Sequence, residues 1–229
     1  MAIWSRTPIS DSDRARSVVL LHGLGRTPRS MQPLATTLES RGYRVFNLGY
    51  PSRTAGVGSL AAHVAQQVRS IDDNRPLHFI THSLGGILLR VAVKSGELPL
   101  DRIARVVMLG PPNGGSHVPD AFGRWKISGA LYRLVTGPAG LELGIGAGSV
   151  ASRLPPLPFE AGIIAGSRSV NPVLSLFLPG QNDGKVSVEH ASVDGMRAFL
   201  VMPHSHPFLM SAQPVMTRAI RFLETGAFE

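Results

Sequence analysis

The sequence of 229 residues contains no cysteine, few aromatic residues and few charged residues. The lack of cysteine excludes disulfide bonds and cysteine-based metal sites. Aromatic residues make up only 6% of the chain, and no basic stripe is interleaved with them, which argues against nucleic-acid binding although the net charge is +8. Phosphate-binding loops, dinucleotide-binding motifs and zinc-type histidine pairs are also missing. We therefore expect neither a metal ion nor a cofactor.

Long apolar runs are lacking as well. No segment has the length needed to span a bilayer, and residues 1–17 contain no apolar core of signal-peptide length. We therefore expect a soluble, cytoplasmic protein, although a secreted mature chain would look the same. The positive net charge leaves open an attraction to anionic substrates or to membrane surfaces, including transient contact with a lipid surface.

Short apolar runs and amphipathic helical segments alternate along the first half of the chain, and this alternation predicts an α/β fold. The expected strands lie at 17–21, 43–50, 77–81 and 103–110, and the expected helices lie at 30–42, 58–71 and 84–94. Parallel strands joined by right-handed crossovers place helices on both faces of the sheet. The chain length and the hydrophobic content of 43% fit a single domain over residues 1–229.

The alternation breaks over residues 113–160, which are rich in glycine and proline. Two short helices are expected there, at about 118–125 and 129–136. A long excursion of this kind usually forms a lid or cap beside an active site. Its apolar side chains either form the core of cap helices or line an acyl pocket. Beyond it we expect strands at 161–167 and 197–202 and a final helix at 212–226.

Ser83 stands where an expected strand ends and an expected helix begins, in the segment THSLGG. A nucleophile elbow has this strand–turn–helix context, and it lifts the serine oxygen clear of the sheet. Strand and helix lie very close at such a turn, so the residues two before and two after the serine must be small. Gly85 meets this requirement, and Thr81 is small but branched. The alternative role for this serine is a helix N-cap.

A nucleophilic serine requires a base and an orienting carboxylate, and in this type of fold they follow the serine in the order acid, then histidine. His204 and His206 both follow the last expected strand, and we favour His206 because the apolar run after it can anchor the loop. The expected acid is Asp183, in the triplet Asn-Asp-Gly and ahead of a short extended stretch. Such a triplet is also common in plain surface turns, and Glu189 and Asp194 are alternative acids.

Two backbone N–H groups must stabilise the oxyanion that forms during acyl transfer. The N–H of Leu84 follows the nucleophile, and the N–H of Leu24 lies in the glycine-containing loop LLHGLGRT after the first expected strand. His22 precedes the serine in the chain, so we expect it to hold this loop by hydrogen bonds and not to act as the base. We expect His82, next to the serine, to shape the pocket.

The segments LLHGLGRTPRSM, THSLGG, VMLGPPNGGS, NDGKVSV and HSHPFLM together resemble the α/β-hydrolase superfamily, and within it small bacterial lipases and esterases. The resemblance covers roughly residues 17–223. It implies Ser83 as nucleophile, Asp183 as acid, His206 as base and Leu24 as the second oxyanion donor. It also implies a mostly parallel sheet of about six strands, with a small helical cap or lid over 113–160.

These observations predict a serine carboxylester hydrolase, an esterase or lipase that acts on a small-molecule ester or lipid through an acyl-enzyme. A thioesterase or an acyltransferase would use the same site. A binding protein that has kept the fold without the chemistry is a further alternative.

Overall fold

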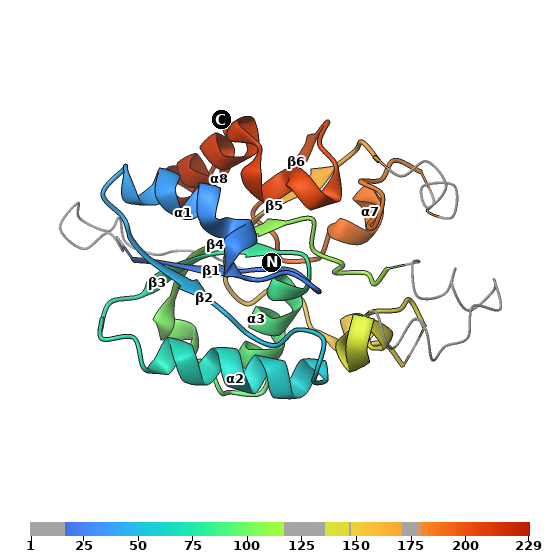
Figure 1. Ribbon diagram of the computed structural model, residues 1–229, viewed down its shortest axis with the longest axis horizontal. Helices are drawn as coiled ribbons and strands as arrows, with labels where there is room; N and C mark the ends of the chain where they lie inside the picture. Colours follow the sequence, from blue (N-terminus) through green and yellow to red (C-terminus); the bar gives the residue numbers. More distant parts are fainter. Residues whose placement is uncertain (1–16, 117–135, 147, 171–177, 179) are drawn as a thin grey trace.

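The computed structural model describes residues 17–116, 136–146, 148–170, 178 and 180–229 (Figure 1). Within these residues six strands form one sheet in the order β2-β1-β3-β4-β5-β6, and all neighbouring strands are parallel. The strands are β1 (Ser17–Leu21), β2 (Arg44–Leu48), β3 (Leu77–His82), β4 (Ile103–Leu109), β5 (Glu160–Gly166) and β6 (Ala198–Met202). The predicted parallel sheet of about six strands is confirmed.

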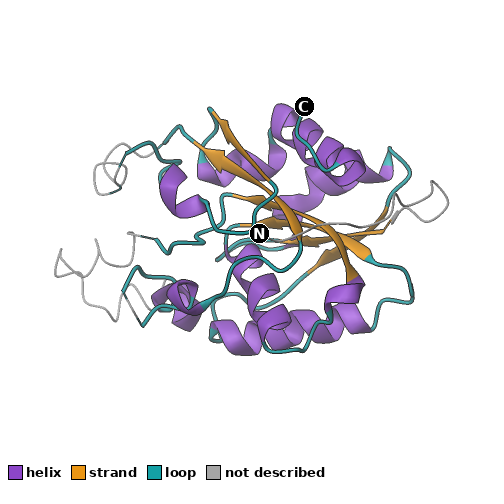
Figure 2. Cartoon of the chain, turned by 180° about the vertical axis from the view of Figure 1, so that it is seen from behind, coloured by secondary structure: helices purple, strands orange, loops and turns teal. Residues whose placement is uncertain are grey.

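Helices cover both faces of the sheet, as predicted (Figures 1 and 2). Helices α1 (Gln32–Glu39) and α8 (Gln213–Thr225) pack on one face, and α2 (Val57–Arg69) and α3 (Leu84–Lys94) pack on the other. Successive strand side chains point to opposite faces, so Val18 and Leu20 contact the α1 side while Val19 and Leu21 contact the α2 side. Because both faces are buried, the central strands are continuous apolar runs.

Two local expectations are wrong in detail. The helix expected at 30–42 forms as a 3-10 turn, η1 (Pro28–Met31), followed by α1. The break follows from Pro33, which has no N–H to donate to the preceding turn. The extended stretch expected after Asp183 ends in a short helix, α7 (Val188–Ala191), because the hydroxyl of Ser187 caps it by accepting the N–H of His190 at 3.2 Å.

The remaining short elements are the 3-10 turns η2 (Leu100–Arg102), η3 (Ala151–Arg153) and η4 (His206–Ser211). Among the described residues, no helix combines the length and apolar character needed to cross a membrane.

The described part of the excursion 113–160 is tied to the body of the fold by hydrogen bonds. The expected helix at 118–125 lies outside the described residues, as does the one at 129–136 apart from its last residue, and residues 136–141 are helical. The N–H of Val57, at the start of α2, donates to Glu142 Oε2 at 3.0 Å. The N–H of Ser116 donates to the carbonyl of Leu143 at 2.9 Å. These bonds hold Glu142 beside the start of α2 and Leu143 beside the chain that follows β4.

Candidate active site

Ser83 lies at the turn between β3 and α3 in a strained backbone conformation. Its φ is 53° and its ψ is −119°, and in the described part of the chain it is the one non-glycine residue with a positive φ. Backbone strain of this kind concentrates at functional sites. The serine side chain makes no capping hydrogen bond to the helix that follows. The N-cap interpretation therefore does not describe this serine.

The strand and helix that flank Ser83 approach each other closely. A Cβ atom added to Gly85 would lie 2.6 Å from the carbonyl oxygen of Leu21 on the neighbouring strand β1, so only glycine fits there. Thr81 is completely buried, and its Oγ1 would lie 3.2 Å from a Cβ atom added to Gly86. Small residues on both sides of the serine thus allow the sharp turn.

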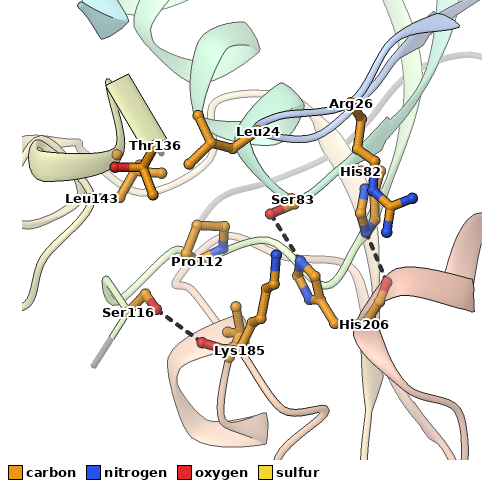
Figure 3. A pocket seen from close by; sticks show the side chains of 12 residues that line it. Leu24, Arg26, His82, Ser83, Pro112, Ser116, Thr136, Leu143, Lys185 and His206 are labelled. Atoms are coloured by element: carbon orange, nitrogen blue, oxygen red, sulfur yellow. Dashed lines mark hydrogen bonds between the residues drawn. The ribbon is translucent and has the colours of Figure 1, made fainter. Parts of the chain in front are cut away.

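Three predicted site residues from different loops meet at this turn, and Figure 3 shows two of them, Ser83 and His206. His206, at the start of η4, places Nε2 3.0 Å from Ser83 Oγ and Nδ1 2.7 Å from Asp183 Oδ2. A carboxylate only accepts hydrogen bonds, so the proton between these two residues lies on Nδ1. The unprotonated Nε2 then accepts from the hydroxyl of Ser83.

Asp183 is held in place by its own loop. Its Oδ1 accepts the backbone N–H groups of Lys185 at 3.0 Å and Val186 at 2.9 Å, and the side chain is buried. Its backbone carbonyl also accepts the N–H of His206 at 3.0 Å. The carboxylate therefore orients the imidazole of His206 from a fixed position.

The structure does not bring the alternative residues to Ser83. His204 is only partly buried, and none of the described hydrogen bonds joins its ring to Ser83 or to Asp183. Glu189 and Asp194 are exposed. Of the candidates that the sequence left open, the described hydrogen bonds therefore connect only His206 and Asp183 to Ser83.

His22 and His82 both lie beside the site in buried positions. The ring of His22 stacks on Tyr50 at 4.0 Å, and its Nδ1–H donates to the carbonyl of Gly23 at 2.9 Å, which agrees with a structural role for the loop after β1. His82 Nε2–H donates to the carbonyl of His206 at 3.0 Å. Burial lowers the pKa of both rings, most strongly that of His82, so both are neutral at neutral pH.

Two glycines shape the space around the Asp183–His206 pair, and sequence reasoning missed both. Gly110 follows β4 with a φ of +54°, and an added Cβ atom would lie 3.1 Å from Asp183 Oδ2 and 3.1 Å from His206 Nδ1. A Cβ atom on Gly166, at the end of β5, would lie 2.7 Å from the Cβ atom of Asp183. Each glycine ends an apolar run, and that pattern is the sequence signal for a tightly packed strand end.

A pocket lies next to Ser83, and the sequence did not predict several of the residues that line it. It is lined by Leu24, Arg26, His82, Ser83, Pro112, Ser116, Thr136, Gly140, Leu143, Lys185, Val186 and His206. Residues from the excursion 113–160 thus form one side, and two cationic side chains reach another (Figure 3). Among the described residues, no group of three histidine or carboxylate side chains is placed to hold a metal ion.

Several solved structures are similar to this one. No curated protein matches the sequence significantly. The mature lipase BlEst2 from Bacillus licheniformis aligns with a TM-score of 0.76 at 19% identity, over 97% of this chain and 96% of the lipase. A metagenomic carboxyl esterase aligns with a TM-score of 0.68 at 19% identity, over 97% of this chain and 80% of that one. Phospholipase PlaB from Legionella pneumophila aligns with a TM-score of 0.63 at 19% identity, over 91% of this chain and 56% of the phospholipase chain.

At this level of identity the structural likenesses establish a shared fold. The sequence profile of the Alpha/beta hydrolase family matches residues 18–219, which is most of the chain. The chain therefore belongs to the alpha/beta hydrolase family.

Proposed function

We propose that the protein is a serine carboxylester hydrolase in which Ser83 is the nucleophile, His206 the base and Asp183 the orienting acid. The observation that carries the proposal is the unbroken path from Asp183 Oδ2 to His206 Nδ1 at 2.7 Å and from His206 Nε2 to Ser83 Oγ at 3.0 Å. This path ends on a serine held at a φ of 53°. The base is thus within hydrogen-bond reach of both the nucleophile and the orienting acid, as covalent catalysis requires.

The first half of the reaction forms an acyl-enzyme. Ser83 Oγ attacks the ester carbonyl carbon while His206 Nε2 accepts the hydroxyl proton, and the carbonyl oxygen becomes an oxyanion. His206 then donates that proton to the alcohol oxygen as its bond to carbon breaks, and the alcohol leaves. In the second half, His206 takes a proton from water, the resulting hydroxide attacks the acyl carbon, and Ser83 recovers its proton as the acid departs.

The N–H groups of Leu24 and Leu84 are the proposed oxyanion donors. Leu84 is the first residue of α3, where a helix has no internal acceptor for its N–H groups. Leu24 follows β1 and lines the pocket. Within the described residues, no hydrogen-bond acceptor is recorded for either N–H. Each donor would contribute about 3 kcal/mol to transition-state stabilisation.

We also propose that the excursion 113–160 is a cap that borders the acyl site. Ser116, Thr136, Gly140 and Leu143 line the pocket from this segment, and Leu24 adds an apolar wall from the loop after β1. The similar structures are named a lipase, a carboxyl esterase and a phospholipase. These names favour an oxygen ester over a thioester as the substrate of the same site.

A fluorophosphonate probe tests the nucleophile directly. We expect the folded protein to be labelled at Ser83, and Ser83→Ala to abolish labelling while the circular dichroism spectrum is unchanged. An unlabelled, folded wild type would overturn the proposal and favour a binding protein. A panel of p-nitrophenyl esters and acyl-CoA thioesters then separates an esterase from a thioesterase.

Matched histidine variants test the base. His206→Ala should lower kcat by a factor of about 10⁴ or more, because it removes both the proton acceptor and the partner of Asp183. His204→Ala should have little effect, since none of the described hydrogen bonds joins its ring to Ser83 or Asp183. A large loss of kcat in His204→Ala and little change in His206→Ala would show that His204 is the base.

A further inference from the structure

We propose that the alcohol part of the ester substrate carries an anionic group, a carboxylate or a phosphate, which Arg26 and Lys185 bind. This inference rests on the proposed esterase function and names the substrate class of that site. It starts from the charges that surround the pocket: two cationic side chains line it together with Ser83 and His206.

The two cations reach the pocket from separate loops. Arg26 lies two residues beyond Leu24 in the loop after β1, and Lys185 lies two residues beyond Asp183. The backbone of Lys185 is fixed, because its N–H donates to Asp183 Oδ1 at 3.0 Å and its carbonyl accepts the hydroxyl of Ser116 at 2.9 Å. Figure 3 shows the Lys185 side chain extending into the pocket toward Ser83 and His206.

Among the described residues, neither cation has a counter-ion of its own. Within the described residues, no ion pair or side-chain hydrogen bond is recorded for the guanidinium of Arg26 or for the ammonium of Lys185. Asp183 is the carboxylate nearest in sequence to Lys185 and acts on its charge, but it already accepts three hydrogen bonds, including that from His206. Among the described residues that line the pocket, no carboxylate balances these two positive charges beside Ser83.

The two cations also act on each other. Crowding by protein atoms and the charge of Arg26 lower the pKa of Lys185, although solvent still reaches this exposed side chain. Both charges contribute to the lowered pKa of His82, behind burial and the nearby His206. Like charges that share a site repel each other. A bound anion would relieve this repulsion and form charge-assisted hydrogen bonds with both side chains.

The position of His206 assigns the charge to the alcohol and not to the acyl chain. His206 Nε2 must donate a proton to the leaving oxygen, so the alcohol lies on the His206 side of Ser83. In Figure 3 the ammonium of Lys185 lies beside His206 and Arg26 lies beside His82, whereas Leu24, Thr136 and Leu143 gather on the other side of Ser83. The acyl chain therefore faces the apolar wall, and the alcohol faces the cations.

Matched butanoate esters of nitrophenols provide the experiment. One nitrophenol carries a ring carboxylate, a second carries a phosphate group, and the reference carries a neutral carboxamide at the same position. We expect kcat/KM to be about tenfold or more higher for an anionic ester than for the carboxamide. Whichever anionic ester is faster identifies the anion, and the preference should fall as ionic strength rises.

Single-charge variants make the test specific. Lys185→Gln and Arg26→Gln should each lower the ratio of anionic to neutral kcat/KM about tenfold. Arg41→Gln is the control, because it removes one positive charge from an exposed position outside the pocket, and it should leave the ratio unchanged. A p-nitrophenyl ester with a carboxylate at the far end of its acyl chain should show no advantage over its uncharged counterpart.

The outcomes separate this inference from the proposed function. If no ester is cleaved, the esterase proposal itself fails. If all esters are cleaved with equal kcat/KM, or if the acyl-charged ester is the preferred one, the esterase proposal stands and the anionic-alcohol inference is overturned. The same holds if Arg41→Gln lowers the ratio as much as Lys185→Gln does.

Discussion

Replacing Gly110 by alanine should damage catalysis through two separable effects. Gly110 has a φ of +54°, and an alanine there costs about 1–2 kcal/mol in backbone strain. The added Cβ atom would also lie 3.0 Å from Leu209 Cδ1 and 3.1 Å from both Asp183 Oδ2 and His206 Nδ1. Atoms at that separation must move apart by a few tenths of an ångström, and here the atoms that move form the 2.7 Å hydrogen bond between acid and base.

Gly96 provides the matched control for strain. Its φ is +77°, and a Cβ atom added there meets nothing within 4 Å. Gly96→Ala should therefore lower the free energy of unfolding by about 1–2 kcal/mol and leave kcat unchanged. Gly110→Ala should lower the free energy of unfolding by at least as much, and should also lower kcat by roughly 10- to 100-fold, because small displacements of catalytic groups are costly.

Urea unfolding and steady-state hydrolysis of a p-nitrophenyl ester, measured on both variants, check the prediction. The informative quantity is the difference between the two variants, since the strain is common to both. If Gly110→Ala keeps the kcat of the wild type, the close packing of Gly110 against the acid–base pair has no role in orienting it, and our account of this strand end is refuted.

Two further predictions concern residues beside the serine. Thr81→Leu should lower the free energy of unfolding by about 1–3 kcal/mol and slow fluorophosphonate labelling, because Thr81 is completely buried at the elbow. Thr81→Val replaces a buried hydroxyl that has no hydrogen-bond partner among the described residues, so it should keep full labelling and raise the melting temperature. Equal behaviour of the two variants would contradict this account. The pKa of His82 is depressed in the folded protein, so below about pH 6.5 His82 becomes protonated in the unfolded chain but stays neutral in the folded chain. The free energy of unfolding should therefore fall by about 1.4 kcal/mol for each pH unit below that value. Urea unfolding between about pH 5 and 8 should show a smaller slope for His82→Gln, and an unchanged slope would show that His82 does not stay neutral in the folded protein.

The fold was accessible from the sequence because its signals are local. A buried parallel strand is an apolar run wherever it lies, and the helix faces follow from spacing alone. The same is true of the turn at Ser83, where small residues on both sides reveal a close approach of strand and helix. The helix expected at 30–42 begins as an α-helix only at Gln32, and the missing N–H of Pro33 accounts for this difference.

The site was only partly accessible, because it depends on contacts between distant loops. The sequence could rank His206 above His204, but only the path of the loop after β6 brings one ring to Asp183 and leaves the other partly exposed. Arg26 and Lys185 are ordinary loop residues in the sequence, and their convergence on one pocket comes from the order of the strands in the sheet. Gly110 resembles any glycine after a strand until its neighbours are known.

The loop that carries Asp183 shows why a surface turn and the proposed catalytic position need not be competing interpretations. Asn182 Oδ1 accepts the N–H of Gly184 at 3.1 Å, which is a side-chain-stabilised turn of the kind that such triplets commonly form. Gly184 has a φ of +95°, and the tight reversal that this permits brings the N–H groups of Lys185 and Val186 back to Asp183 Oδ1. The turn therefore fixes the carboxylate that orients His206. The same reversal sends the next side chain, that of Lys185, into the pocket. A change that abolished the turn, such as replacing Gly184 by a β-branched residue, should therefore affect acid orientation and anion preference together.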